Sequence, residues 1–154
     1  MRANPVESPE ALDRLAGTTL ASEPFFLAAR VSGQGSGAAN RRLAELGLKV
    51  RHYSVLALAC SDVHPTQREL SHYLLLDPSQ IVALIDELQA LGAVQREPDP
   101  RDRRSKMVVA TAAGRALYRR AKKVVDAASS DSLSALTTEQ REDFLALLRL
   151  AAFG

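Results

Sequence analysis

The sequence has few of the features that stabilise small secreted proteins or anchor a chain in a membrane. A single cysteine, Cys60, excludes an intramolecular disulfide and favours a reducing compartment. No apolar run approaches the roughly 18 residues that a membrane-spanning helix needs. The first ten residues also lack the apolar segment of a secretory signal. We therefore expect a cytoplasmic protein with no membrane association.

Aromatic residues and enzyme motifs are also scarce. Aromatic residues make up 5% of the 154 residues and tryptophan is absent, which argues against a surface that stacks single-stranded bases. The sequence contains no P-loop, HExxH, GxSxG or dinucleotide-binding glycine motif. His52, His64 and His72 match no compact metal-ligand spacing. We therefore expect no enzyme, no cofactor and no metal site.

What the sequence does contain is typical of one globular domain, with 46% hydrophobic and 25% charged residues. The net charge is only +2, but residues 96–123 hold ten Lys/Arg and three Asp/Glu, a local charge of +7. Such a cluster predicts a surface that faces a polyanion. For Arg115, Arg119, Arg120, Lys122 and Lys123 the favoured interpretation is a solvated helical face, although Arg115 lies near enough to the expected hairpin to reach a phosphate.

Apolar periodicity and capping residues predict a mainly helical chain. Helices are expected over about residues 10–20, 22–46, 51–60, 66–74, 78–91, 111–128 and 138–151. Gly33, Gly35 and Gly37 fall within the second helix, where each glycine costs about 1 kcal/mol relative to alanine. They predict a kink, a break or a close helix crossing. Ser129–Ser132 is expected to interrupt or end the sixth helix.

Two of these helices are adjacent and begin with clear capping signals. Thr66 and Glu69 form a capping box, and the helix that follows is expected to turn Leu70, Tyr73 and Leu74 inward. Asp77-Pro78 begins the next helix, whose apolar stripe is Ile81, Leu84, Ile85, Leu88 and Leu91. The short connection between them indicates a helix-turn-helix.

Two short extended segments follow this pair. Residues 93–97 and 106–110 have strand character, and the loop between them is rich in charge and proline. A hairpin with a charged tip directly after a helix-turn-helix is a wing. The predicted fold class is therefore mainly α with a small β-wing.

The chain resembles the MarR family of winged helix-turn-helix transcriptional regulators. The resemblance rests on DPSQIVALIDEL at residues 77–88, GAVQR at 92–96, DPRDRR at 99–104 and TAAGR at 111–115. It implies one domain over residues 1–154. In that domain, residues of about 10–46 and 112–153 form dimerisation helices, and about 50–110 form the DNA-binding lobe. It also implies a homodimer that places two recognition helices in double-stranded DNA about one turn apart.

Within that fold, several side chains are candidates for DNA contact. Gln80 is the best base-reading candidate because its amide matches adenine, and Ser79 can contact a base or a phosphate. Ala83 lies on the same exposed face. For Ser79 and Gln80, helix capping is an equally simple role. The helix start at Thr66, Gln67 and Arg68 is a candidate for phosphate contact.

The expected recognition helix presents an electrostatic conflict. Residues 77–91 contain no Lys or Arg but three acids, a formal charge of −3 on an element that should approach a polyanion. Wing arginines Arg101, Arg103 and Arg104 offer compensation, since a narrow minor groove attracts arginine. The resemblance assigns the wing contact to Arg104, with Asp102 beside it. It also implies that Asp86 braces Arg104 through a salt bridge, formed in the DNA-free protein or after a modest movement of the wing.

Two groups of residues bear on regulation. Arg51, His52 and Tyr53 are placed by the resemblance near the crevice where many relatives bind small effectors, although ordinary packing is the favoured role for them. Cys60 lies in an apolar helix, so a packing role is favoured over a redox switch.

The resemblance therefore implies a homodimeric regulator, a ligand-relieved repressor, on a pseudo-palindromic operator. The alternative is a winged-helix module that binds protein or RNA without a specific operator, and it is supported by the acidic recognition helix.

Overall fold

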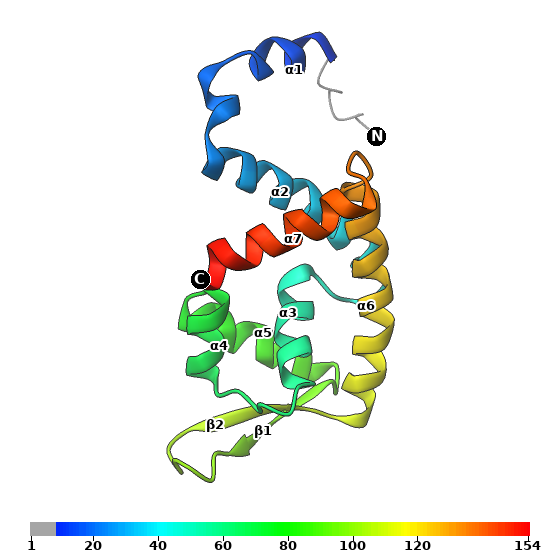
Figure 1. Ribbon diagram of the computed structural model, residues 1–154. Helices are drawn as coiled ribbons and strands as arrows, with labels where there is room; N and C mark the ends of the chain where they lie inside the picture. The colour runs from blue at the N-terminus through cyan, green and yellow to red at the C-terminus, as the bar shows by residue number, and fades with distance from the viewer. Residues whose placement is uncertain (1–8) are drawn as a thin grey trace. The chain divides into compact units, whose positions relative to one another are not determined.

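The structure is a computed structural model that describes residues 9–154 (Figure 1). By its internal contacts the chain divides into two compact units, one ending at Gly37 and the other spanning Ala38–Gly154. The first unit contains α1 (Pro9–Ala16), a 3-10 turn η1 (Thr19–Ser22) and the first part of α2 (Pro24–Leu43). No helix in the described part of the chain is long and apolar enough to cross a membrane.

Helix α2 is continuous through Gly33, Gly35 and Gly37, so the break that the glycines suggested does not occur. Leu43 at its end is fully buried. A 3-10 turn, η2 (Ala44–Leu46), then leads to Gly47, whose φ of 70° is left-handed. Glycine adopts that conformation at no steric cost, so the helical segment formed by α2 and η2 ends at Gly47.

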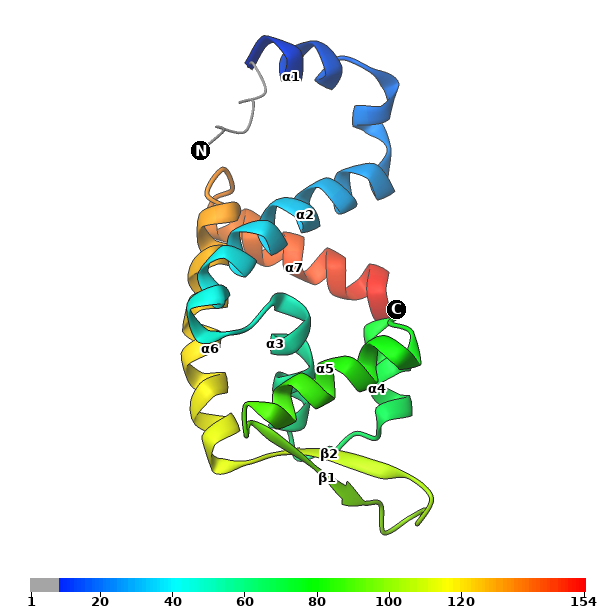
Figure 2. The ribbon, with the colours of Figure 1, turned by 180° about the vertical axis from the view of Figure 1, so that it is seen from behind.

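The second unit is a winged helix-turn-helix lobe with two further helices. Its lobe contains α3 (Val50–Ala59), α4 (Gln67–Leu74), α5 (Pro78–Ala90), β1 (Val94–Pro98) and β2 (Lys106–Ala110), and α6 (Ala112–Ser132) and α7 (Thr138–Phe153) follow. Figures 1 and 2 show α3, α4 and α5 grouped beside α6, with the β1–β2 hairpin at one end of the group. The predicted fold class is confirmed.

The lobe has one apolar core, to which each of its helices contributes. Leu56 from α3, Leu70 from α4, Ile81 and Ile85 from α5, and Val108 from β2 are all fully buried. Burying a side chain of this size stabilises the fold by about 1.5–3 kcal/mol. The apolar stripe predicted for residues 81–88 is therefore the core face of α5.

Two residues expected in the core are exposed. Leu91 follows the last residue of α5 and is 51% exposed, because the chain turns at Gly92 (φ 68°) before the stripe can continue. Tyr73 is 60% exposed, and its ring stacks on Phe153 of α7 instead, with centroids 5.9 Å apart.

The wing is an antiparallel hairpin that begins one residue later than predicted. Val94 pairs with Ala110 and Pro98 with Lys106. Val108 N–H also donates to the carbonyl of Pro65 at 2.8 Å, which ties the wing to the segment before α4. At its base, Thr111 Oγ1 donates to the Gly92 carbonyl at 2.6 Å. A Cβ at Gly114 would lie 1.8 Å from the Ala93 carbonyl oxygen, so only glycine fits there.

The last two helices extend beyond this core. Helix α6 ends at Ser132, within the segment that was expected to interrupt or end it, and Asp131 in its last turn pairs with Arg42. Helix α7 begins at the cap Thr137 but has no buried residue. Its large apolar side chains are exposed in the chain by itself: Leu145, Leu147, Leu148, Leu150 and Phe153.

Candidate nucleic-acid interface

The first helix of the helix-turn-helix begins with a closed capping box. Thr66 N–H and Oγ1 both donate to Glu69 Oε2, at 2.7 and 2.9 Å, and Glu69 N–H donates back to Thr66 Oγ1 at 3.2 Å. These bonds stabilise the carboxylate and lower the pKa of Glu69, although desolvation opposes the shift. The Thr66 side chain is therefore engaged within the lobe.

The two neighbouring candidates for phosphate contact differ from each other. Gln67 Oε1 accepts a hydrogen bond from Arg96 Nε at 2.7 Å, so this amide is also engaged internally. Arg68 is exposed and makes no ion pair within residues 9–154. Of the predicted set Thr66, Gln67 and Arg68, the structure leaves the Arg68 side chain free to meet a phosphate.

The turn between α4 and α5 places the second helix. Ser71 Oγ donates to the Leu76 carbonyl at 2.6 Å, and Leu75 adopts a left-handed backbone with φ 52°. A non-glycine residue in that region costs about 1–2 kcal/mol. The turn therefore depends on the surrounding packing rather than on its own sequence, which is why no sequence signal marked Leu75.

At the start of α5, the exposed residues include the predicted Ser79, Gln80 and Ala83. Gln80 Oε1 accepts a hydrogen bond from Asp77 N–H at 3.2 Å, so it caps the helix in this structure. Capping uses the amide oxygen and leaves the Gln80 NH₂ group as a donor. Base reading by Gln80 and Ser79 remains a prediction.

The carboxylates farther along α5 are bonded to the rest of the lobe. Asp86 Oδ1 accepts from Arg96 Nη2 at 2.6 Å. Glu87 Oε2 lies 2.7 Å from Nε2 of His52, a side chain that is 7% exposed. Since His52 Nδ1 accepts from Lys49 N–H at 3.0 Å, Nε2 carries the proton and donates to Glu87. Two of the three acids thus have hydrogen-bond partners within the lobe, although only Asp86 is paired with a charged group and both carboxylates are more than half exposed.

The expected Asp86–Arg104 salt bridge does not form in this structure. Asp86 is paired with Arg96 of β1, which reaches the carboxylate from the strand. Arg104 makes no ion pair with any described residue. The sequence could not distinguish the two arginines, because both belong to the hairpin and only the register of β1 decides which one faces α5.

The wing loop is shaped by two aspartates. Asp99, only 3% exposed, accepts from Arg101 N–H at 2.8 Å and from its guanidinium at 3.0 and 3.1 Å. These bonds lower the pKa of Asp99 and raise the pKa of Arg101. Asp102 accepts from Arg104 N–H and Ser105 Oγ at 3.0 and 3.2 Å. Asp102 thus orders the turn that presents Arg104.

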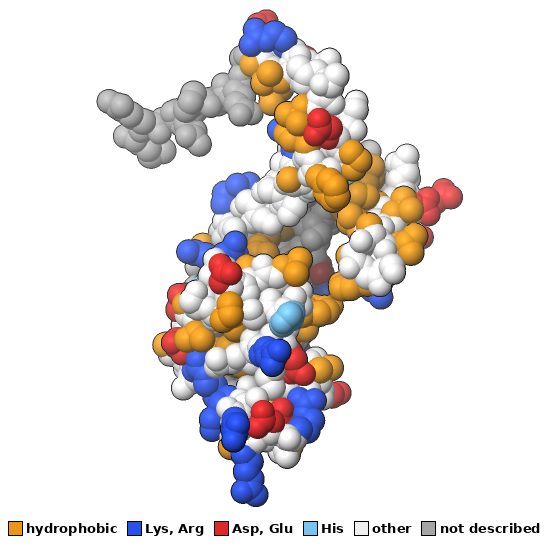
Figure 3. Space-filling view, turned by 90° about the vertical axis from the view of Figure 1, so that its left-hand side faces the viewer, with side chains coloured by type: hydrophobic (Ala, Val, Ile, Leu, Met, Phe, Trp, Pro, Cys, Tyr) orange, Lys and Arg blue, Asp and Glu red, His pale blue; other side chains and the backbone are white. Residues whose placement is uncertain are grey.

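The three predicted wing arginines therefore divide into two kinds. Arg101 is held by Asp99 and lies 3.8 Å from Glu69, so it ties the wing to α4. The side chains of Arg103 and Arg104 are exposed and unpaired within residues 9–154. Lys and Arg side chains gather at the hairpin end of the molecule, as Figure 3 shows. This end can contact a polyanion.

Part of the basic helix after the wing has a structural role. Arg115 Nη1 donates to the Cys60 carbonyl at 3.0 Å, so it does not extend toward a phosphate here. Lys122 pairs with Asp126 one turn later, as expected of a solvated face. Burial raises the pKa of the Cys60 thiol although Arg115 and Arg119 lower it in part. The half-buried thiol is therefore a poor nucleophile.

The residues suggested for effector binding do not share one cavity. His52 lines a cavity of about 360 Å³ with Asn40, Lys49 and Glu87. Tyr53 stacks on Tyr118, with centroids 5.7 Å apart, and burial raises its pKa to about 12. Arg51 is exposed. The described residues contain no cluster of three or more potential metal ligands.

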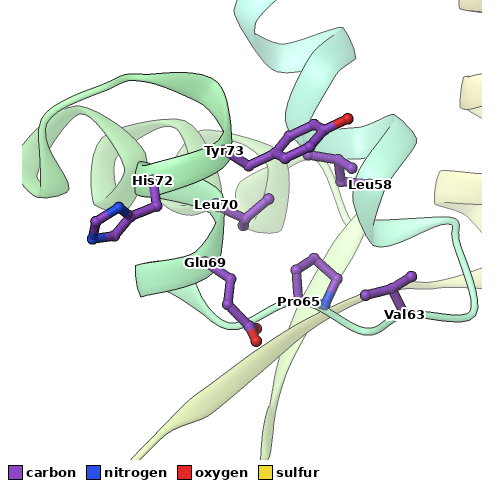
Figure 4. A pocket seen from close by; sticks show the side chains of 7 residues that line it. All are labelled: Leu58, Val63, Pro65, Glu69, Leu70, His72 and Tyr73. Atoms are coloured by element: carbon purple, nitrogen blue, oxygen red, sulfur yellow. The ribbon is translucent and has the colours of Figure 1, made fainter. Parts of the chain in front are cut away.

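A larger cavity lies beside α4 and was not predicted (Figure 4). It has a volume of about 570 Å³, which is within the range of ligand pockets. Its lining residues come from the end of α3, the following loop and α4: Leu58, Val63, Pro65, Glu69, Leu70, His72 and Tyr73. Exposed Val63 and Tyr73 form part of an apolar wall, and Glu69 and His72 are its polar groups. All of its walls come from residues 58–73, but no local pattern marked it, because the cavity depends on how α4 packs against the end of α3.

Comparison with known proteins agrees with this architecture. A sequence model of the MarR family matches residues 46–105. The HTH-type transcriptional repressor Rv2887 of Mycobacterium tuberculosis is 31% identical over 106 residues, which are 69% of this chain and 76% of the relative. Rv2887 has also been solved in complex with p-aminosalicylic acid, with a TM-score of 0.71 and 27% identity over 84% of this chain and 98% of that chain.

Two solved structures from Rhodococcus are more similar. A MarR family transcriptional regulator from Rhodococcus sp. RHA1 is 40% identical, with a TM-score of 0.83 over 89% of this chain and 97% of that chain. CouR from Rhodococcus jostii RHA1, bound to p-coumaroyl-CoA, is 38% identical, with a TM-score of 0.79 over 89% of this chain and 96% of that chain. Since its fold, its wing and its sequence are all similar to those of these regulators, the chain belongs to the MarR family of transcriptional regulators.

Proposed function

We propose that this chain is a homodimeric repressor that reads a pseudo-palindromic operator in double-stranded DNA and is released by a small effector. The observation that carries the DNA-binding part is the division of charge in the lobe. Asp86 is paired with Arg96 and Glu87 is hydrogen-bonded to His52, whereas the Arg103 and Arg104 side chains are exposed and unpaired within the described chain. A helix in which Asp86 is paired with an arginine and Glu87 is hydrogen-bonded within the lobe can enter a major groove while free arginines reach the flanking minor groove.

The homodimer is supported by helix α7. It has no buried residue, and Leu147 and Leu150 are 65% and 68% exposed. An apolar face of this extent is typical of an interface between copies rather than of a solvent-facing helix. The dimerisation helices would be those of about residues 10–46 and 112–153, with the DNA-binding lobe at about 50–110. Two copies related by a two-fold axis would then present two recognition helices to successive major grooves.

An effector site is supported by the cavity beside α4. Its apolar walls at Leu58, Val63 and Tyr73 suit an aromatic ring, and His72 supplies a hydrogen-bonding group. Because relatives bind p-aminosalicylic acid and p-coumaroyl-CoA, the effector class we propose is an aromatic acid or its thioester. A ligand wedged against α4 would shift the helix-turn-helix and weaken operator binding.

The decisive experiment selects duplexes from a random double-stranded library with the full-length wild-type protein. Fluorescence anisotropy then compares a selected duplex with a scrambled one at one stated salt concentration. We expect a pseudo-palindrome with a preference of about 10³-fold or more. Equal binding to every duplex would contradict operator reading and favour the alternative, a module that binds protein or RNA.

Two further measurements address the dimer and the effector. Light scattering should give twice the chain mass for wild type and one chain mass for Leu147→Glu, with Glu142→Gln on the same helix as the control. Salicylate-type acids and p-coumaroyl-CoA should release the selected duplex from wild type but not from Val63→Trp, which fills the cavity. Leu91→Trp, outside the cavity, is the matched control. Release from both variants alike would place the effector elsewhere.

A further inference from the structure

Arg96 joins three elements of the lobe through one guanidinium group. It lies on β1 and its side chain is 23% exposed. Nε donates to Gln67 Oε1 of α4 at 2.7 Å, Nη1 to Gln89 Oε1 at 2.7 Å and Nη2 to Asp86 Oδ1 at 2.6 Å, the last two on α5. The planar group thus points one donor at α4 and two at α5 from the wing strand.

The geometry of this contact restricts rotation of α5. Asp86 and Gln89 are three residues apart and lie on one helix face. Ser79 lies close to the same face two turns earlier, so the direction in which Asp86 is held also sets the direction of the predicted base-reading residues. Gln67 is the first residue of α4. Arg96 therefore fixes α5 against the helix that precedes it and the strand that follows it.

We propose that Arg96 is a positioning residue for operator recognition, which holds α4, α5 and the wing strand in the arrangement that reads DNA and does not itself supply a phosphate contact. This inference rests on the proposed function. Three of its five N–H groups are used within the protein, in directions that a lysine ammonium cannot reproduce. An arginine that only neutralised a phosphate would need its positive charge, but it would not need three hydrogen bonds in these fixed directions.

The test measures binding of three variants to the duplex selected by wild type and to a scrambled duplex, over a range of salt concentrations. Arg96→Lys keeps the charge, Arg96→Met removes it, and Arg120→Met on α6 controls for the loss of a surface arginine. We expect both Arg96 variants to lose about tenfold or more of the preference for the selected duplex. Scrambled-duplex affinity and the salt slope should stay at the wild-type values, and Arg120→Met should keep the preference.

A double-mutant cycle separates positioning from a general loss of stability. Asp86→Ala with Gln89→Leu removes the two acceptors on α5, and adding Arg96→Met should then cause little further loss of preference, since the interaction with α5 is already gone. Thermal melting checks that each variant is folded at the assay temperature, and Arg96→Lys is the variant that keeps the test valid if Arg96→Met unfolds.

Three results would overturn the proposal. In the first, Arg96→Lys restores wild-type binding while Arg96→Met lowers the salt slope by about 0.9 for each phosphate that is no longer neutralised, so that Arg96 is a phosphate contact. In the second, both variants keep the wild-type preference. In the third, the cycle is additive. Failure of the wild-type selection itself is a different outcome, because it contradicts operator reading and not the role of Arg96.

Discussion

The recognition helix α5 and the wing loop both carry several charges, and the lobe arranges those charges in opposite ways. In α5 the acids Asp86 and Glu87 are turned toward Arg96 and His52 of neighbouring elements. In the wing, Asp99 holds Arg101, whereas the Arg103 and Arg104 side chains extend unpaired within residues 9–154. The formal charge of an element therefore does not predict the potential that it presents, because the counter-groups come from elsewhere in the chain.

The contrast between α5 and the wing loop requires that the hairpin is held in place at its base, where Gly114 meets Ala93. Gly114→Ala should destabilise the lobe by about 3 kcal/mol, because overpacking forces backbone to move and the new Cβ would lie 1.8 Å from the Ala93 carbonyl oxygen. Urea unfolding followed by circular dichroism measures the change. Gly17→Ala is the matched control, since its Cβ meets only the Arg14 carbonyl oxygen at 3.5 Å. Equal stability of the two variants would contradict the close approach.

Removing the free arginines should have the largest effect on DNA binding. Arg103→Ala with Arg104→Ala should lower affinity for selected and scrambled duplexes by about 100-fold at low salt and reduce the salt slope by about 0.9 for each phosphate left without its arginine. Anisotropy titrations over salt measure both quantities, with Arg120→Ala as the control. An unchanged slope would show that the wing does not touch DNA and that the contrast with α5 has no functional meaning.

The inward bonding of α5 can be tested at Glu87. Glu87→Ala leaves the buried Nε2–H of His52 without its acceptor and should cost about 1 kcal/mol of unfolding free energy. Glu87→Gln keeps an amide oxygen as acceptor, so it should retain most of that stability. Chemical unfolding at neutral pH measures the difference. If Gln and Ala were equally destabilising, the contact would depend on charge and not on the hydrogen bond.

The smallest expected effect is on pH dependence. The bonds from Thr66 lower the pKa of Glu69 below its usual 4.5, so the folded lobe binds this proton less tightly than the unfolded chain does. The stability that Glu69 contributes is present above pH 4.5 and is lost as the pH falls through the folded pKa. Melting from about pH 6 to about pH 3.5 should therefore show a smaller decline for Glu69→Gln.

The control for this pH experiment is Glu142→Gln, an exposed carboxylate on α7 that makes no ion pair in the described part of the chain. It should keep the wild-type decline. Some decline should remain in Glu69→Gln as well, because the pKa of Asp99 is also lowered. A wild-type decline in Glu69→Gln would mean that the capping box does not contribute through the ionised carboxylate.

Local sequence signals predicted most of the elements. The capping residues Thr66 and Asp77 each precede the helix that was expected from them, and Gly47 and Gly92 are both left-handed. A cap satisfies backbone groups within three residues, and a left-handed glycine depends on its own φ and ψ. Such interactions are encoded in short stretches of sequence and can be recognised without a fold.

Side-chain partners were decided by the tertiary structure. Asp86 pairs with Arg96 and not with Arg104, Tyr73 stacks on Phe153, and Arg115 binds the Cys60 carbonyl. Each of these contacts joins residues from different elements, and a hydrogen bond depends on distance and direction within a few tenths of an ångström. By itself the sequence determined a winged helix-turn-helix with acids on one helix and arginines on its wing. Only the tertiary structure decided which of those charges are paired, because the packing of β1 against α5 is what places the Arg96 guanidinium beside the Asp86 carboxylate.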